Sequence, residues 1–209
     1  MIEKAGTGER VYLAIKAYLA GSDLRPGERL DIADLSRRAA ASATPIRAAL
    51  HRLVGERLLI SHQGEGFSIP RMTEPALADL YNWNASLLVQ AARTAVGRSL
   101  ALYDFEGADA MTDTVVKVER LFARVAALSG NMEVEWAVAA ANDRLHRLRR
   151  IELDLIPDST KELGELAELA MAEDQARLRQ ALLTYHRRRL RLVPALIRAL
   201  HGLGDRSAR

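Results

Sequence analysis

Cysteine is absent from the 209 residues of this chain, and long hydrophobic runs are absent as well. Without cysteine there is no disulfide, no thiolate zinc site and no cysteine nucleophile, so any metal ion must be bound by His, Asp, Glu or Asn. No apolar run approaches the roughly 20 residues of a membrane-spanning helix. The start of the chain is charged and unlike a signal peptide. We therefore expect a cytoplasmic protein without a membrane segment.

Neither sign of charge dominates, because 30 Lys and Arg face 27 Asp and Glu for a net charge of +3. The arginines nevertheless cluster in residues 37–57, 144–150 and 187–191. For the two later clusters, solvated helix faces and functional surfaces remain open alternatives. Hydrophobic residues make up 49% of the chain, which is enough to bury one large core or two small ones.

Apolar side chains recur at helical spacing in three successive segments near the start of the chain. The first predicted helix, residues 7–20, ends before a turn at Pro26. Asp31 is suited to cap a second helix, and Thr44 to cap a third with Pro45 at its first position. The apolar positions of these helices are Val11, Ile15, Leu19, Ile32, Leu35, Ala39, Ile46, Ala49, Leu50, Leu53 and Val54.

The hydrophobic period changes after the third helix. Two short apolar segments, 58–61 and 67–69, flank the turn-rich residues 62–66 and predict a two-stranded hairpin closed by Pro70. Three helices followed by a hairpin form the layout of a winged helix-turn-helix, which we assign to residues 1–71.

From Met72 onward the strand signals disappear, and Ala, Leu, Glu and Arg recur with a helical period. We expect five or six helices in residues 72–209, with Thr73 capping the first. The predicted fold class is therefore mainly α, with an N-terminal winged helix-turn-helix and a C-terminal all-helical bundle.

The third predicted helix leaves Arg47, His51 and Arg52 exposed opposite its apolar stripe. In a helix-turn-helix, the first turn of the recognition helix enters the major groove. Arg47 lies in that turn, where a guanidinium can bind guanine with two hydrogen bonds. We therefore predict that Arg47 reads the DNA sequence.

Other residues near this helix are predicted to contact DNA without reading bases. The hydroxyls of Ser42 and Thr44 and the backbone amides beside them suit a phosphate, and Arg38 belongs to the same basic cluster. At the hairpin tip, His62 and Gly64 are predicted to let the backbone approach the minor groove. The alternative is that the tip is only a tight turn.

A linear signature runs from Leu24 to Leu58, with Leu24-Arg-Pro-Gly-Glu-Arg-Leu30 followed by Ser42-Ala-Thr-Pro-Ile-Arg-Ala-Ala-Leu50. It resembles the signature of the GntR family of regulators, which reads approximately Leu-x-Pro-Gly-x-x-Leu and then Ser-Arg-Thr-Pro-Val-Arg-Glu-Ala-Leu. Ala43 stands where the family has a DNA-contacting arginine, and Ala48 where it has glutamate. The resemblance therefore implies that base reading depends on Arg47 with help from Arg52 or His51.

The helical part resembles the FadR-like branch of that family, the FCD domain, a bundle of six or seven helices around a central pocket. This resemblance implies a small-carboxylate effector and a divalent metal, zinc or nickel. Asn142 and His146, four residues apart, and His186 match part of the family's metal motif, but residues 161–171 lack its further histidine. The alternative is that both histidines line a pocket or an interface without a metal.

The resemblance also implies an effector pocket, in which this chain has Asn84 and Leu88 where relatives carry Arg and Glu. A more apolar effector, or none, is therefore an alternative to the carboxylate. The implied pocket residues are Asn84, Leu88, Asn142, His146 and His186. Four aromatic residues at helical spacing from Leu and Val are expected in the core: Tyr81, Trp83, Phe122 and Trp136.

Three classes of function remain. The leading class is a transcriptional regulator, more often a repressor in this family, that binds double-stranded operator DNA as a homodimer and responds to a small molecule. The alternative is a helical interaction protein that has lost sequence-specific DNA binding, with which Ala43 and Ala48 are compatible. An enzyme, such as a metal-dependent hydrolase with Asp143 or Glu135 as base, is disfavoured because no nucleophile triad, phosphate loop or HExxH pattern is present.

Overall fold

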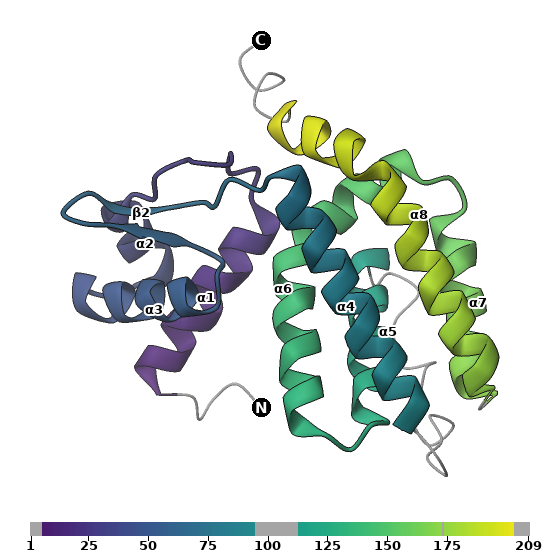
Figure 1. Ribbon diagram of the computed structural model, residues 1–209. Helices are drawn as coiled ribbons and strands as arrows, with labels where there is room; N and C mark the ends of the chain where they lie inside the picture. Colours follow the sequence, from purple (N-terminus) through teal and green to yellow (C-terminus); the bar gives the residue numbers. More distant parts are fainter. Residues whose placement is uncertain (1–5, 95–112, 173, 203–209) are drawn as a thin grey trace. The chain divides into compact units, whose positions relative to one another are not determined.

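The computed structural model describes residues 6–94, 113–172 and 174–202 (Figure 1). The chain folds as two compact units, of which the first reaches Met72 and the second runs from Thr73 to Arg198. The described residues form eight helices and one two-stranded sheet, which confirms the predicted, mainly α fold class. The elements are α1 Thr7–Gly21, α2 Ile32–Ala39, α3 Ala43–Gly55, β1 Ile60–His62, β2 Gly66–Ser68, α4 Glu74–Thr94, α5 Thr114–Ala127, α6 Met132–Leu155, α7 Ser159–Met171 and α8 Gln175–Gly202.

The first unit is a three-helix core with a hairpin. α1 packs along α3, and the apolar stripes predicted for these helices meet in one buried cluster that includes Val11, Ile15, Leu50 and Leu53. Burial of these side chains, at about 25 cal/mol per Å² of apolar surface, stabilises the unit. The core therefore leaves the opposite face of α3 in solvent.

The helix starts follow local capping chemistry. Asp31 caps α2 as predicted, because its Oδ1 accepts a hydrogen bond from the Ala33 amide at 2.8 Å. The predicted cap of α3 was wrong. Ser42, not Thr44, is the N-cap, since its backbone is extended and its carbonyl accepts from the Ile46 amide. Pro45 then lies in the first turn, where its missing N–H removes no helical hydrogen bond.

The hairpin that forms the wing is antiparallel, with Ile60 opposite Ser68 and His62 opposite Gly66. Its strands are displaced by one or two residues from the predicted segments. The tip uses positive φ values at Gly64 (72°) and Gly66 (90°), which glycine adopts without strain. The other edge of β2 is also paired, because the Leu30 amide donates to the Phe67 carbonyl at 2.9 Å.

The second unit contains α4 to α8, with α4, α5 and α6 packed against one another (Figure 1). Its core contains Leu88, Phe122 and Val138 among other apolar side chains. Tyr81 and Phe122 are buried as expected, but Trp83 and Trp136 are 54% and 60% exposed. That expectation was wrong for the tryptophans.

The helical rotation explains the error at Trp136. Val134 and Val138 are the buried positions of α6 on either side of it. Two residues correspond to about 200° around an α-helix, so Trp136 faces away from the core. Apolar neighbours in the sequence therefore did not imply burial here.

Candidate functional site

The exposed face of α3 is the first candidate site. Arg47 and Ala48 are exposed, while Ile46 and Leu50 beside them are buried in the core of the unit. Arg47 has no hydrogen bond or ion pair with another residue in the described part of the chain. Its guanidinium therefore keeps its donors available near the N-terminal end of the helix, where Arg47 is the fifth residue.

Arg52, predicted as a second DNA-contacting residue, is held within the unit. Its Nη1 lies 2.6 Å from the Glu9 carboxylate, its Nε lies 3.3 Å from Glu56, and its guanidinium stacks 3.5 Å over the Tyr12 ring. The hydrogen bond to Glu9 raises the pKa of Arg52 above its ordinary value. Arg52 therefore links α3 to α1 through these contacts.

His51 and Arg38 also have partners within the unit. The His51 ring packs edge-on against Phe67 of the wing, with ring centroids 5.0 Å apart. Arg38 pairs with Asp34 at 2.5 Å and lies over the Tyr18 ring. That hydrogen bond lowers the pKa of the Asp34 carboxyl. Both residues remain exposed, and each contacts another side chain of the unit.

The start of α3 and the wing tip differ in what they leave available. Ser42 and Thr44 are exposed, and the Ser42 hydroxyl does not cap its own helix. At the wing, the His62 Nε2 is 2.8 Å from the Ser68 hydroxyl, and Glu65 forms an ion pair with Arg29. The start of α3 therefore offers hydrogen-bond donors to an anion, whereas His62 is engaged by its own hairpin.

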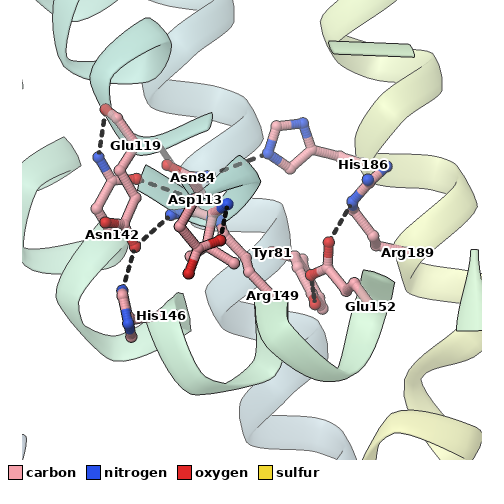
Figure 2. A network of polar contacts seen from close by, with 11 residues as sticks. Tyr81, Asn84, Asp113, Glu119, Asn142, His146, Arg149, Glu152, His186 and Arg189 are labelled. Carbon is pink, nitrogen blue, oxygen red and sulfur yellow. Dashed lines mark hydrogen bonds and ion pairs between the residues drawn. The ribbon is translucent and has the colours of Figure 1, made fainter. Parts of the chain in front are cut away.

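The second candidate site is the polar centre of the helical unit, which we define as Glu119, Asn142, His146 and Arg149 (Figure 2). Asn142, His146 and Arg149 are four and three residues apart on α6, so they share one face, and Glu119 reaches them from α5. The Glu119 Oε1 lies 2.9 Å from His146 Nδ1 and 3.3 Å from Arg149 Nη1. A carboxylate between an imidazole and a guanidinium therefore organises this centre.

Asn142 uses both ends of its amide. Its Oδ1 accepts from Arg149 Nη2 at 2.8 Å, and its Nδ2 donates to the Glu119 carbonyl at 3.1 Å. The first contact lies within α6 and the second joins α6 to α5. The side chain of Asn142 therefore links α6 to α5 and holds Arg149 in place.

His186 of α8 has different partners from Asn142 and His146. Its Nε2 lies 3.2 Å from Asn84 Nδ2 and its Nδ1 lies 2.7 Å from the Leu182 carbonyl, so both ring nitrogens are engaged. Burial, together with the charges of Arg189 and Arg149, lowers the pKa of His186 to about 3 against the effect of the Leu182 hydrogen bond. His186 is therefore a neutral, buried histidine.

Four of the five predicted pocket residues are buried, and His146 is partly buried. Leu88 is fully buried in the apolar core, and Asn84 and His186 are buried against each other. A groove of about 820 Å³ between α7 and α8 is lined by none of the five. Its lining residues include Lys161, Glu165, Leu169, Gln180 and Arg188.

The predicted metal ligands do not fit a metal ion. Among the residues that the structure describes, no group of three or more His, Asp or Glu gathers to hold one. The oxygen of Asn142 and both nitrogens of His186 already have protein partners. A zinc or nickel ion needs three or four free donors, which this arrangement does not offer.

Sequence reasoning missed a second buried network in the helical unit. Arg189 pairs with Glu152 at 2.7 Å and with Glu162 at 2.8 Å, and it stacks 3.2 Å over the Tyr185 ring. Tyr81 donates to Glu152 as well (Figure 2). The sequence did contain a signal for this network. Glu152 continues the apolar stripe of α6, so the helical period places this charged residue at a buried position.

The chain is similar to known bacterial regulators. The sequence model described as "Bacterial regulatory proteins, gntR family" matches residues 7–69. The Nta operon transcriptional regulator of Aminobacter aminovorans is 31% identical in an alignment of 139 positions, which covers 61% of this chain and 66% of that protein. The HTH-type transcriptional repressor GlaR of Escherichia coli K12 is 29% identical over 87 residues, 42% of this chain and 40% of that protein. Each match thus spans less than two thirds of the length of the relative.

Two solved structures share the fold over nearly the whole chain. E. coli McbR/YncC superimposes with a TM-score of 0.67 at 19% identity, covering 91% of this chain and 98% of that one. A protein of Rhodococcus sp. RHA1 described as a GntR transcriptional regulator gives 0.68 at 15% identity, covering 90% and 97%. The residues 7–69 that match the family model are those of the winged helix-turn-helix unit. Over residues 7–69, the chain is similar to the GntR family of bacterial regulatory proteins.

Proposed function

We propose that this protein is a transcriptional regulator that binds operator DNA through α3 and is controlled by a small molecule bound in its helical unit. The observation that carries the proposal is the exposed Arg47, the fifth residue of α3, which has no partner among the described residues. The names of the two curated relatives, a regulator and a repressor, support it. Repression is the mode of action that we propose.

Arg47 is suited to read a guanine. Two donors of its guanidinium can pair with the O6 and N7 acceptors in the major groove, and such a pair discriminates by about 1 to 3 kcal/mol. The exposed Ser42 and Thr44 stand where they can bind a phosphate and position the helix. Because Arg52 is engaged by Glu9, we propose that base reading rests on Arg47.

The experiment measures binding to a fluorescent duplex from the region upstream of the protein's own gene, and to a scrambled duplex, at several salt concentrations. A regulator binds its own duplex more tightly, and its affinity falls steeply with salt because phosphate contacts release counterions. An interaction protein that has lost DNA reading binds both duplexes equally and weakly. That second result would overturn the proposal.

We further propose that the regulator is a homodimer, because two copies bind the two halves of an operator. The exposed Trp83 on α4 and Trp136 and Met132 on α6 offer apolar surface that a second copy would cover. Light scattering after gel filtration tests this for the full chain and for Trp136→Ala. The expected result is a dimer that is weakened in the variant, and a monomeric wild-type protein would contradict it.

The helical unit is proposed as the effector-binding unit of the FadR-like branch. A ligand that binds only the folded state raises its unfolding temperature by mass action, so thermal shifts with candidate small molecules test the proposal. In the polar centre Arg149 forms an ion pair with Glu119, and elsewhere in the unit Arg189 forms ion pairs with two carboxylates. Both buried cations are therefore already neutralised and do not favour a carboxylate effector. We propose no catalytic activity.

None of the described helices is long and apolar enough to cross a membrane. A regulator that binds operator DNA works where the DNA is, so we propose the cytoplasm as its location.

A further inference from the structure

We propose that Arg149 is an internal cation that closes the polar centre and excludes a divalent metal from it. The side chain is 3% exposed, and its charge lies between the Glu119 carboxylate and the Asn142 amide oxygen, on the stripe of α6 that faces the core. Asn142 lies seven residues before Arg149 and His146 three, so all three point to one place (Figure 2).

Arg149 forms hydrogen bonds with the oxygen atoms that a metal ion would need as ligands. Nη1 lies 3.3 Å from Glu119 Oε1, and Nη2 lies 2.8 Å from Asn142 Oδ1. The guanidinium also lies 5.3 Å from the centre of the Phe122 ring, where the face of an aromatic ring attracts a cation. A carboxylate oxygen, an amide oxygen and a π-face thus surround one positive charge.

The same residues would otherwise make a suitable ligand set. A carboxylate, an amide oxygen and the His146 imidazole are donor types that zinc and nickel accept, and His146 lies 2.9 Å from the shared Glu119 oxygen. With Arg149 in place, a metal ion would bring two further positive charges next to a buried guanidinium. Like charges a few ångströms apart in a buried site repel strongly, so ion and guanidinium are mutually exclusive.

The charge balance agrees with this exclusion. Arg149 and Glu119 form a one-to-one ion pair, and His146 Nδ1 donates to the same carboxylate. Removing the guanidinium leaves a poorly exposed carboxylate without its cation, next to an amide oxygen and an imidazole. The vacated position then has three donors of suitable chemistry, with water able to complete the coordination.

The test measures bound metal in the untagged, full-length protein after incubation with zinc or nickel and removal of free ions by gel filtration. The wild-type protein should retain far less than one ion per chain, and its unfolding temperature should not respond to zinc, nickel or a chelator. Arg149→Ala should retain about one ion per chain and unfold at a higher temperature when the ion is added. Adding His146→Ala to that variant should abolish both changes, which separates this site from surface histidines.

A wild-type protein that holds one ion per chain, with a chelator lowering its unfolding temperature, would overturn the proposal. An Arg149→Ala variant that folds and binds no metal would overturn it as well. Should Arg149→Ala not fold, Arg149→Met keeps the apolar stem in the core while removing the charge, and the wild-type measurement decides the exclusion by itself. The proposal does not rest on DNA binding, so a failure of the proposed function leaves this test unchanged.

Discussion

The exposed face of α3 and the interior of the helical unit both contain arginines, but these arginines differ in their surroundings. Arg47 is exposed and has no partner among the described residues, whereas Arg149 and Arg189 are buried and paired with carboxylates. An exposed guanidinium costs little in water and can pair with DNA, while a buried one is stable only with its partners. The surroundings of an arginine therefore decide whether it reads a ligand or supports the fold.

Arg52 lies between these extremes. It is half exposed on α3, the helix that we propose to contact DNA, yet Glu9, Glu56 and the Tyr12 ring engage it. Screened surface pairs contribute only about 0 to 1 kcal/mol, so DNA could displace these partners at low cost. The comparison nevertheless ranks Arg47 before Arg52 as the base-reading residue.

The largest effect is expected from breaking the buried network. Arg189→Ala should lower the free energy of unfolding by about 3 to 5 kcal/mol, because Glu152 would stay buried without its cation. Denaturant unfolding followed by circular dichroism measures the change. The matched control is Arg187→Ala, an exposed neighbour on α8, which should change stability by less than about 0.5 kcal/mol. Equal effects of the two substitutions would remove the distinction between buried and exposed arginines.

The neutral state of His186 predicts a loss of stability in acid. Its folded pKa of about 3 lies below the value of 6.5 expected in the unfolded chain, so the unfolded state binds a proton first as the pH falls. The contribution of neutral His186 to the free energy of unfolding is fully present above pH 6.5. Below that pH it falls by about 1.4 kcal/mol per pH unit, which is a loss of about 2 kcal/mol by pH 5.

Unfolding of the wild-type protein, of His186→Phe and of His201→Gln at pH 7, 6 and 5 tests that loss. His186→Phe should show a shallower pH dependence than the wild-type protein. His201→Gln, which changes an exposed histidine of the same helix, should follow the wild-type slope. Parallel slopes for all three proteins would mean that His186 is accessible to protons in the folded state.

A glycine in the turn before α3, at position 40, is expected to raise the stability of the protein. Ala40 has φ 46° and ψ 53°, a left-handed conformation that costs an alanine about 1 to 2 kcal/mol. Ala40→Gly removes this strain at an entropic cost of about 0.5 to 1 kcal/mol, so stability should rise by about 0.5 to 1 kcal/mol. The control Ala48→Gly, in the helical backbone of α3, should lose about 1 kcal/mol. A loss of stability in both variants would contradict the conformational argument.

The smallest effect is expected at Tyr185, whose buried hydroxyl has no hydrogen-bond partner among the described residues. Tyr185→Phe should be neutral or slightly stabilising, because it removes an unsatisfied polar group. The matched substitution Tyr81→Phe removes a hydroxyl that donates to Glu152 and should cost about 1 to 3 kcal/mol. If Tyr185→Phe cost as much as Tyr81→Phe, the hydroxyl of Tyr185 would have a partner such as a buried water.

The winged helix-turn-helix unit could be predicted from the sequence because its signals are local. Helical periods, the Asp31 cap and the glycine-rich turn each involve residues close together in the chain. The cap of α3 was missed because Ser42 and Thr44 are both good capping residues. Only the extended backbone of Ser42 distinguishes them.

The polar centre could not be predicted because its partners are distant in sequence. Glu119 and Arg149 are separated by 30 residues, and no local sequence pattern encodes such a pair. The same holds in the first unit for Arg52 and Glu9, which are 43 residues apart. The family motif pointed to Asn142 and His146 but not to the arginine three residues on. Knowing that Arg149 fills the space between the donors required the packing of α5 against α6.

The exposed Arg47 is the residue that we propose to read the operator. The most direct test measures the preference for the protein's own upstream duplex over a scrambled one by fluorescence anisotropy, for the wild-type protein, Arg47→Ala and Arg57→Ala. Arg57 is an exposed arginine just beyond the other end of α3, so its substitution removes the same charge.

Arg47→Ala should reduce the preference by about 5- to 150-fold, the equivalent of about 1 to 3 kcal/mol. Arg57→Ala should leave the preference unchanged and at most weaken binding to both duplexes equally. An Arg47→Ala protein that keeps the wild-type preference would contradict the account.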